Sequence, residues 1–213
     1  MNAGPVLIGL TGPIGCGKST VAGWLASMGG RRIDMDMLAR EVTAPGTATL
    51  PAVRRRFGDG VFAADGSLDR AALAAIVFRD PAALEDLERI VHPFVRERLV
   101  EEVASAGAAG VPFVVIEAIK LVESGIAAAC DVVWIVDCGP EMQRARLSGR
   151  GVTPEDAERR MAAQGAGLAD RLLARLAAEW PSVPVLRLAT DGPEAEVRAV
   201  VNGALEDTLA ARG

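Results

Sequence analysis

The sequence of 213 residues contains one histidine, two lysines and three cysteines. The cysteines, Cys16, Cys130 and Cys138, are odd in number and show no paired spacing, which argues against a disulfide framework and a zinc site. An excess of positive charge is missing too, because 23 basic and 28 acidic side chains give a formal net charge of −5. General nucleic-acid binding is therefore not expected, since it requires a basic surface.

Long apolar runs are also missing. The sequence contains no run of 18 apolar residues, the length needed to cross a membrane. Residues 1–10 also lack the basic start of a signal peptide. We expect a cytoplasmic protein without membrane partners, either a monomer or a small homo-oligomer. The composition is 50% hydrophobic and 24% charged, which is typical of a globular domain with a buried core.

Short apolar runs alternate with helical patterns, which predicts an α/β fold with a parallel sheet flanked by helices. The predicted strands are residues 6–10, 32–34, 112–116, 132–136 and 184–188. The predicted helices between and after them are residues 21–28, 140–150, 154–164, 168–179 and 193–209. Four helical segments with no strand among them, 37–42, 48–57, 69–78 and 81–109, predict an inserted helical lobe. Pro93 is expected to kink or divide the last of these helices.

One motif is specific for a class of binding site. Residues 12–19 read Gly-Pro-Ile-Gly-Cys-Gly-Lys-Ser and match the phosphate-binding loop G-x-x-x-x-G-K-[ST] between a predicted strand and a predicted helix. Glycines let backbone N–H groups approach phosphate oxygens, and the helix N-terminus adds positive dipole character. In such loops the lysine, here Lys18, reaches the terminal phosphates, and the hydroxyl of Ser19 is a magnesium ligand. The candidate nucleotide contacts are Gly12, Pro13, Ile14, Gly15, Cys16, Gly17, Lys18, Ser19 and Thr20.

The scarcity of asparagine narrows the class of P-loop protein. Guanine-binding GTPases read their base with Asn-Lys-x-Asp, and the only asparagines here are Asn2 and Asn202. Large ATPase motors need a longer chain. A chain of 213 residues with a helical insertion and arginine-bearing helices after its fourth strand matches a small-molecule kinase. Such kinases close lobes over their substrate to exclude water.

Further motifs, in a fixed order over residues 6–164, resemble those of the dephospho-CoA kinase family. Besides the P-loop they are Ile33-Asp34-Met35-Asp36, Ala39-Arg40, Asp65-Gly66-Ser67-Leu68-Asp69-Arg70, His92-Pro93, Leu121-Val122-Glu123, Pro140-Glu141, Arg146, Arg150 and Ala163-Gln164. The resemblance implies transfer of the ATP γ-phosphoryl group to the ribose 3′-hydroxyl of dephospho-CoA, with Mg²⁺. It also implies one kinase domain over residues 1–213. The core would be residues 1–36, 111–140 and 184–213, with a helical substrate lobe at 37–110 and a lid at 141–165.

The resemblance also implies roles for single residues. Asp36 would orient the acceptor hydroxyl and take its proton. Lys18, Arg146 and Arg150 would offset charge on the transferring phosphate. Arg40 and His92 would contact the substrate. For Asp34 two readings stay open, a magnesium ligand through water or a cap of the next helix.

Two segments depart from the family pattern. Where the family has Pro-Leu-Leu-x-Glu, residues 117–123 read Glu-Ala-Ile-Lys-Leu-Val-Glu, and Lys120 is expected to form a surface ion pair. Thr190 stands where the family has an asparagine that helps hold adenine. Two alternatives therefore stay open: a P-loop kinase for another small hydroxyl compound, such as a nucleoside, and a non-catalytic nucleotide-binding paralogue.

Overall fold

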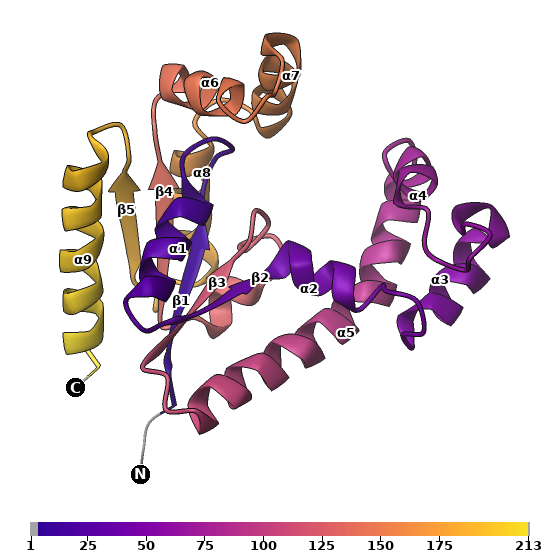
Figure 1. The fold of residues 1–213 in the computed structure, drawn as a ribbon, viewed down its shortest axis with the longest axis horizontal. Helices are drawn as coiled ribbons and strands as arrows, with labels where there is room; N and C mark the ends of the chain where they lie inside the picture. Colours follow the sequence, from indigo (N-terminus) through magenta and orange to yellow (C-terminus); the bar gives the residue numbers. More distant parts are fainter. Residues whose placement is uncertain (1–3, 213) are drawn as a thin grey trace. The chain divides into compact units, whose positions relative to one another are not determined.

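The structure is a computed structural model that describes residues 4–212 (Figure 1). Residues 1–3 and 213, the two ends of the expected kinase domain, lie outside the described residues. The chain divides into a sheet unit, which runs up to Ile33 and resumes at Ala106, and a helical unit, Asp34–Ser105. The helical unit thus begins and ends a few residues before the lobe expected at residues 37–110.

The sheet unit is built on five strands in the order β2-β3-β1-β4-β5. They are β1 (Val6–Thr11), β2 (Arg31–Asp34), β3 (Phe113–Glu117), β4 (Val132–Asp137) and β5 (Val185–Ala189). Strand β1 pairs in parallel with both β3 and β4, and β4 pairs in parallel with β5. Every residue of β3 is buried, as expected for a parallel sheet covered on both faces. The α/β fold predicted from the sequence is confirmed.

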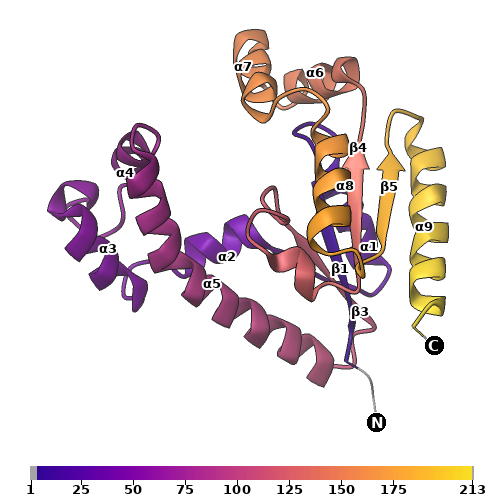
Figure 2. The same ribbon diagram turned by 180° about the vertical axis from the view of Figure 1, so that it is seen from behind.

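Helices cover both faces of this sheet. Helices α1 (Lys18–Ser27) and α9 (Glu194–Ala210) pack on one face, and α8 (Leu168–Glu179) packs on the other (Figures 1 and 2). A helical pair, α6 (Pro140–Ser148) and α7 (Pro154–Gln164), follows β4. The main departure from the predicted boundaries is that α1 begins at Lys18, because the last residues of the phosphate loop already form its first turn.

The hydrophobic core of the sheet unit lies between the sheet and the α1–α9 layer. Ile8 and Leu10 of β1, Phe113 of β3 and Trp134 of β4 are all essentially inaccessible to solvent. Along each strand these side chains alternate with side chains that face α8, since successive side chains of a strand point to opposite faces. Each such buried side chain contributes about 1.5–3 kcal/mol relative to its exposed state, so this layer stabilises the three inner strands of the sheet.

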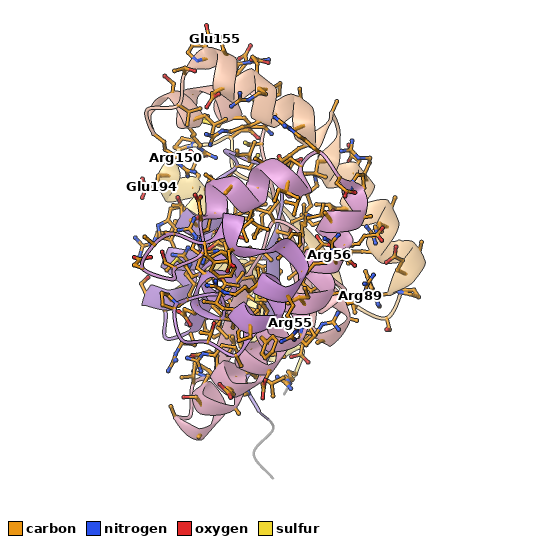
Figure 3. All side chains as sticks on the ribbon, turned by 90° about the vertical axis from the view of Figure 1, so that its right-hand side faces the viewer. Arg55, Arg56, Arg89, Arg150, Glu155 and Glu194 are labelled. Atoms are coloured by element: carbon orange, nitrogen blue, oxygen red, sulfur yellow. The ribbon has the colours of Figure 1, made fainter. Side chains whose placement is uncertain are left out.

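The helical unit has its own small core. Its elements are α2 (Met35–Glu41), α3 (Thr49–Phe57), the 3₁₀ turn η1 (Asp59–Val61), α4 (Arg70–Val77) and most of α5 (Pro81–Ala108). The core consists of buried residues from four of these elements, Val53, Val61, Leu73, Val77 and Ala83. At the surface, Arg56 of α3 forms an ion pair with Asp86 of α5, which ties the two helices together, and Arg89 pairs with the same carboxylate within α5; both arginines are labelled in Figure 3.

Helix α5 contains Pro93 but is one continuous helix of 28 residues. Of the two outcomes expected for Pro93, division of the helix is not observed, whereas the helix changes direction along its length (Figures 1 and 2). A proline removes a single backbone hydrogen bond and crowds the preceding turn, which bends a helix without necessarily ending it. Separately, no helix within residues 4–212 has both the length and the apolar character needed to cross a membrane.

The turn before β2 supplies a test of the packing. A Cβ atom on Gly30 would lie 2.2 Å from the Phe113 ring, and that ring is buried against the sheet. We expect Gly30→Ala to lower the free energy of unfolding by about 1–3 kcal/mol through overpacking. Gly23→Ala is the matched control, because nothing lies within 4 Å of its new methyl group on α1. It should be stabilising by about 0.5–1 kcal/mol. Urea unfolding of both variants measures the difference, and equal stabilities would contradict the packing.

Candidate functional site at the phosphate loop

The phosphate loop connects β1 to α1 and is pressed against the chain around it. Gly12 has φ +139°, and a Cβ there would lie 2.0 Å from the Val136 carbonyl oxygen of β4. A Cβ on Gly15 would lie 3.0 Å from the backbone of Gln143 in α6. Gly17 adopts the left-handed conformation and is the N-cap of α1 without offering a side chain. The loop therefore presents bare backbone, as a phosphate-binding loop must.

Lys18 is buried although it is charged. Its ammonium donates hydrogen bonds to the carbonyl oxygens of Gly12, at 2.8 Å, and Pro13, at 2.9 Å. These contacts fold the side chain back over the loop, so its positive charge stands beside the first amides of α1. The dipole of the helix N-terminus has the same sign, and both favour an anion at this place.

Glu117 is the functional candidate that the sequence analysis missed. It is the last residue of β3, is 7% exposed, and accepts a hydrogen bond of 2.7 Å from the Ser19 hydroxyl through Oε1. Its other oxygen, Oε2, accepts hydrogen bonds from Arg32 of β2 at 2.7 and 3.0 Å. The signal was present, because an acid directly after a buried strand of a P-loop fold lies at the same sheet edge as the loop.

Arg146 of α6 lies directly on the loop. A Cβ on Gly17 would be 3.3 Å from one terminal nitrogen of the Arg146 guanidinium. That group donates to Thr190 twice: to the hydroxyl at 3.0 Å and to the backbone carbonyl at 2.5 Å. The structure thus brings Arg146 together with the loop, whereas Arg150 is exposed in the turn that follows α6 (Figure 3).

Cys16 is a packing residue of the loop. Its side chain is fully buried, donates to the Cys138 carbonyl at 3.7 Å and accepts from the Gln143 amide at 3.4 Å. A hydrogen bond with the Cys138 thiol lowers the pKa of Cys16, and burial opposes this shift. The same contact, together with burial, raises the pKa of the Cys138 thiol. Full burial keeps the Cys16 thiol away from solvent and from a ligand.

The α6–α7 pair is attached to the loop at its far end. The side-chain oxygen of Gln164, the last residue of α7, accepts a hydrogen bond of 2.8 Å from the Ile14 amide. Arg144 and Glu158 form an ion pair that joins α6 to α7. Arg144 therefore contributes to the structure of the pair, and the amide of Ile14 is already engaged by the protein.

The remaining predicted residues belong to the helical unit. Asp34 caps α2, because its Oδ1 accepts from the amides of Asp36 at 2.9 Å and Met37 at 3.2 Å. This is the capping role considered for Asp34. Asp36 is exposed in the first turn of α2, and His92 is half-buried on α5.

Arg40 has a second arginine as its neighbour. Arg70 donates to the Arg40 carbonyl at 3.2 Å and to the Thr43 hydroxyl at 2.8 Å. Burial, and then the nearby charge of Arg40, lower the pKa of the Arg70 guanidinium. The charge of Arg40 thus acts on Arg70, and two positive charges in one neighbourhood favour an anion there. Arg70 was only part of a matched motif in the sequence.

Comparisons with known proteins agree on one family. The dephospho-CoA kinase family profile matches residues 6–177. Dephospho-CoA kinase from Symbiobacterium thermophilum is 46% identical over 159 residues, which cover 74% of this chain and 66% of that relative. Dephospho-CoA kinase from Streptomyces avermitilis is 50% identical over 161 residues, with 74% of this chain and 76% of the relative covered.

Solved structures share the fold. TT1252 from Thermus thermophilus matches with a TM-score of 0.77 and 32% identity, over 96% of this chain and 98% of its own. Dephospho-CoA kinase from Campylobacter jejuni matches with a TM-score of 0.67 over 97% of this chain and 98% of its own. At 19% identity this second likeness concerns the fold alone.

Proposed function

Because the chain belongs to the dephospho-CoA kinase family, we propose that it transfers the γ-phosphoryl group of ATP to the ribose 3′-hydroxyl of dephospho-CoA, giving coenzyme A and ADP. The observation that carries the proposal is the family match over residues 6–177, which includes an intact phosphate loop. The alternatives raised by the sequence, another hydroxyl acceptor or a non-catalytic paralogue, are not favoured by this match.

The sheet unit would bind the triphosphate of ATP. Backbone amides of the loop and of the first turn of α1 would hold the phosphates, and Thr20 lies in that turn. Lys18 would exchange its bonds with the loop carbonyls for bonds with phosphate oxygens. Arg146 would add a second positive charge as charge spreads over the transferring group. Arg150, which is exposed, would approach the phosphates only if the α6–α7 pair moves.

Ser19 and Glu117 offer a donor set suited to Mg²⁺. Both present oxygen atoms, which Mg²⁺ prefers, and their oxygens are 2.7 Å apart. Within residues 4–212 no three His, Cys, Asp or Glu side chains converge on one metal position, so phosphate oxygens and water would complete the shell. When bound, Mg²⁺ would neutralise charge on the phosphate oxygens. Ser19 would be a direct ligand, and Glu117 would hold Ser19 or a bound water.

Asp36 would act on the acceptor. It stands two residues beyond the last residue of β2 and is exposed, so its carboxylate is accessible to a substrate hydroxyl. There it would orient the 3′-hydroxyl and accept its proton during transfer. Arg40 and Arg70 would contact the acidic groups of dephospho-CoA, since the pair favours an anion. His92 is proposed as a further substrate contact, and Asp34 would keep the first turn of α2 fixed, with a water-mediated role toward Mg²⁺ still a prediction.

An acceptor panel tests the proposed reaction. The protein, ATP and Mg²⁺ are incubated with dephospho-CoA, adenosine, a deoxynucleoside and shikimate, and ADP and product mass are followed. We expect phosphorylation of dephospho-CoA, with other acceptors used at least 100-fold less well, because binding contacts to the whole substrate position its hydroxyl. Preference for a different acceptor, or ATP binding with no transfer, would refute the assignment.

The carboxylate of Asp36 gives a second prediction. We expect Asp36→Asn to lower kcat by about 10²–10⁴-fold, because the amide cannot take the proton of the hydroxyl, while ATP affinity stays within threefold. Steady-state kinetics and calorimetry with ATP measure the two effects. Asp80→Asn is the control, since the exposed Asp80 caps α5 and asparagine also caps helices. An Asp36→Asn variant as active as the Asp80→Asn control would remove Asp36 from the reaction.

The donor pair at Ser19 gives a third prediction. We expect Glu117→Gln to raise the Mg²⁺ concentration for half-maximal activity by about 10- to 100-fold, since the variant keeps the shape of the side chain but loses its charge. The Mg²⁺ dependence of ADP binding, followed by calorimetry, should shift in parallel. Glu206→Gln on the exposed face of α9 is the matched charge control. An unchanged Mg²⁺ requirement in Glu117→Gln would contradict the role of Glu117.

A further inference from the structure

Thr190 is a buried polar residue at the junction of three segments. It follows β5 directly and is 2% exposed. Its hydroxyl donates a hydrogen bond of 2.8 Å to the carbonyl of Cys16, inside the phosphate loop. The same oxygen accepts from Arg146 at 3.0 Å. One hydroxyl thus links the loop to the guanidinium that lies on it.

The backbone of Thr190 strengthens this link. Its carbonyl oxygen accepts a hydrogen bond of 2.5 Å from the second terminal nitrogen of Arg146, so the guanidinium is held at two points. Its amide donates to the Asp137 carbonyl at 2.9 Å, which ties the residue to the end of β4. The next residue, Asp191, accepts from the Gly139 amide at 2.7 Å and so fixes the start of α6, the helix that carries Arg146. Residues 190 and 191 therefore hold both the guanidinium of Arg146 and the start of the helix that carries it.

Such anchoring matters because arginine has a long side chain with much rotamer freedom. A guanidinium that is already held 3.3 Å from the Cβ position of Gly17 loses little entropy when a phosphate arrives. Preorganised charge is also worth more to a transition state than charge that must first be ordered. The Thr190 hydroxyl is buried within the protein, where it lies 2.8 Å from the Cys16 carbonyl, 3.1 Å from the Asp137 carbonyl and 3.0 Å from the Arg146 guanidinium.

We propose that Thr190 is a positioning residue, which holds the guanidinium of Arg146 on the phosphate loop so that it meets the terminal phosphates of ATP. The proposal deepens the proposed function, on which it rests for the identity of the acceptor, but its contact with ATP does not depend on dephospho-CoA. Thr190 acts through Arg146 and the loop, and touches neither substrate itself.

A double-mutant cycle tests this link. The variants are Thr190→Val, which keeps the shape and removes the hydroxyl, Arg146→Ala, and the two combined. We expect Thr190→Val to lower kcat and ATP affinity about tenfold each, because a hydrogen bond to a charged group is lost. In the Arg146→Ala background the same change should alter each quantity less than twofold, since residues acting as a unit are not additive.

Two further variants complete the design. Thr190→Ser keeps the hydroxyl and should retain kcat within threefold of the unchanged protein. Thr208→Val on α9 is the matched control for loss of a threonine hydroxyl and should leave both quantities unchanged. Thermal unfolding is measured for each, and Thr190→Ala replaces Thr190→Val in the cycle if the valine variant does not fold.

The outcomes separate this proposal from the proposed function. Multiplicative effects of the two substitutions, or a Thr190→Val variant with unchanged ATP affinity and kcat, would overturn the positioning role. If the unmodified protein does not phosphorylate dephospho-CoA, the proposed acceptor is wrong, and the cycle on ATP affinity alone still decides whether Thr190 acts through Arg146.

Discussion

The close approach of the phosphate loop to the end of β4 is the contact on which the site depends. At Gly12 the backbone comes so near the Val136 carbonyl that even a methyl group would collide with it, at 2.0 Å. This contact fixes where the loop turns, and the turn fixes the direction of α1. Because β1 and β4 are neighbours in the sheet, any shift of their register would move the loop away from α6. The pairing of the parallel strands thus sets the position of the phosphate loop and of its exposed backbone amides.

Charge around this backbone is arranged in two groups. Lys18 and Arg146 add positive charge on the loop itself, where the α1 dipole has the same sign. Glu117 adds a buried negative charge beside Ser19, and Arg32 offsets it at 2.7 Å. A buried carboxylate without such partners would cost several kcal/mol. The hydrogen bonds of Glu117 therefore let an acid persist at the sheet edge where a divalent cation and phosphates would meet.

The sequence was sufficient for the fold and for part of the site. Apolar runs without alternation predicted the strands because a parallel sheet is buried on both faces, and the glycine spacing predicted the loop because only glycine permits its backbone. Glu117, Thr190 and Gln164 were missed as site residues because their importance lies in partners about 100 or more positions away, such as Ser19, Cys16 and Ile14. Local patterns do not identify such partners, although the position of Glu117 at the end of a strand could have placed it at the sheet edge of the loop. Pro93 shows the limit of a local rule, since the rule allowed either a kink or a division and only the structure shows that the helix continues through this proline.

Thr190 shows how one buried hydroxyl can join two parts of a site. From the sequence, this position was expected to bear on adenine binding. Here the hydroxyl is buried and has hydrogen-bond partners as both donor and acceptor, as buried polar groups generally require. The threonine side chain reaches the loop carbonyl and the guanidinium at once. Its hydroxyl therefore makes contacts within the protein, and these contacts hold the positive charge of Arg146 on the phosphate loop.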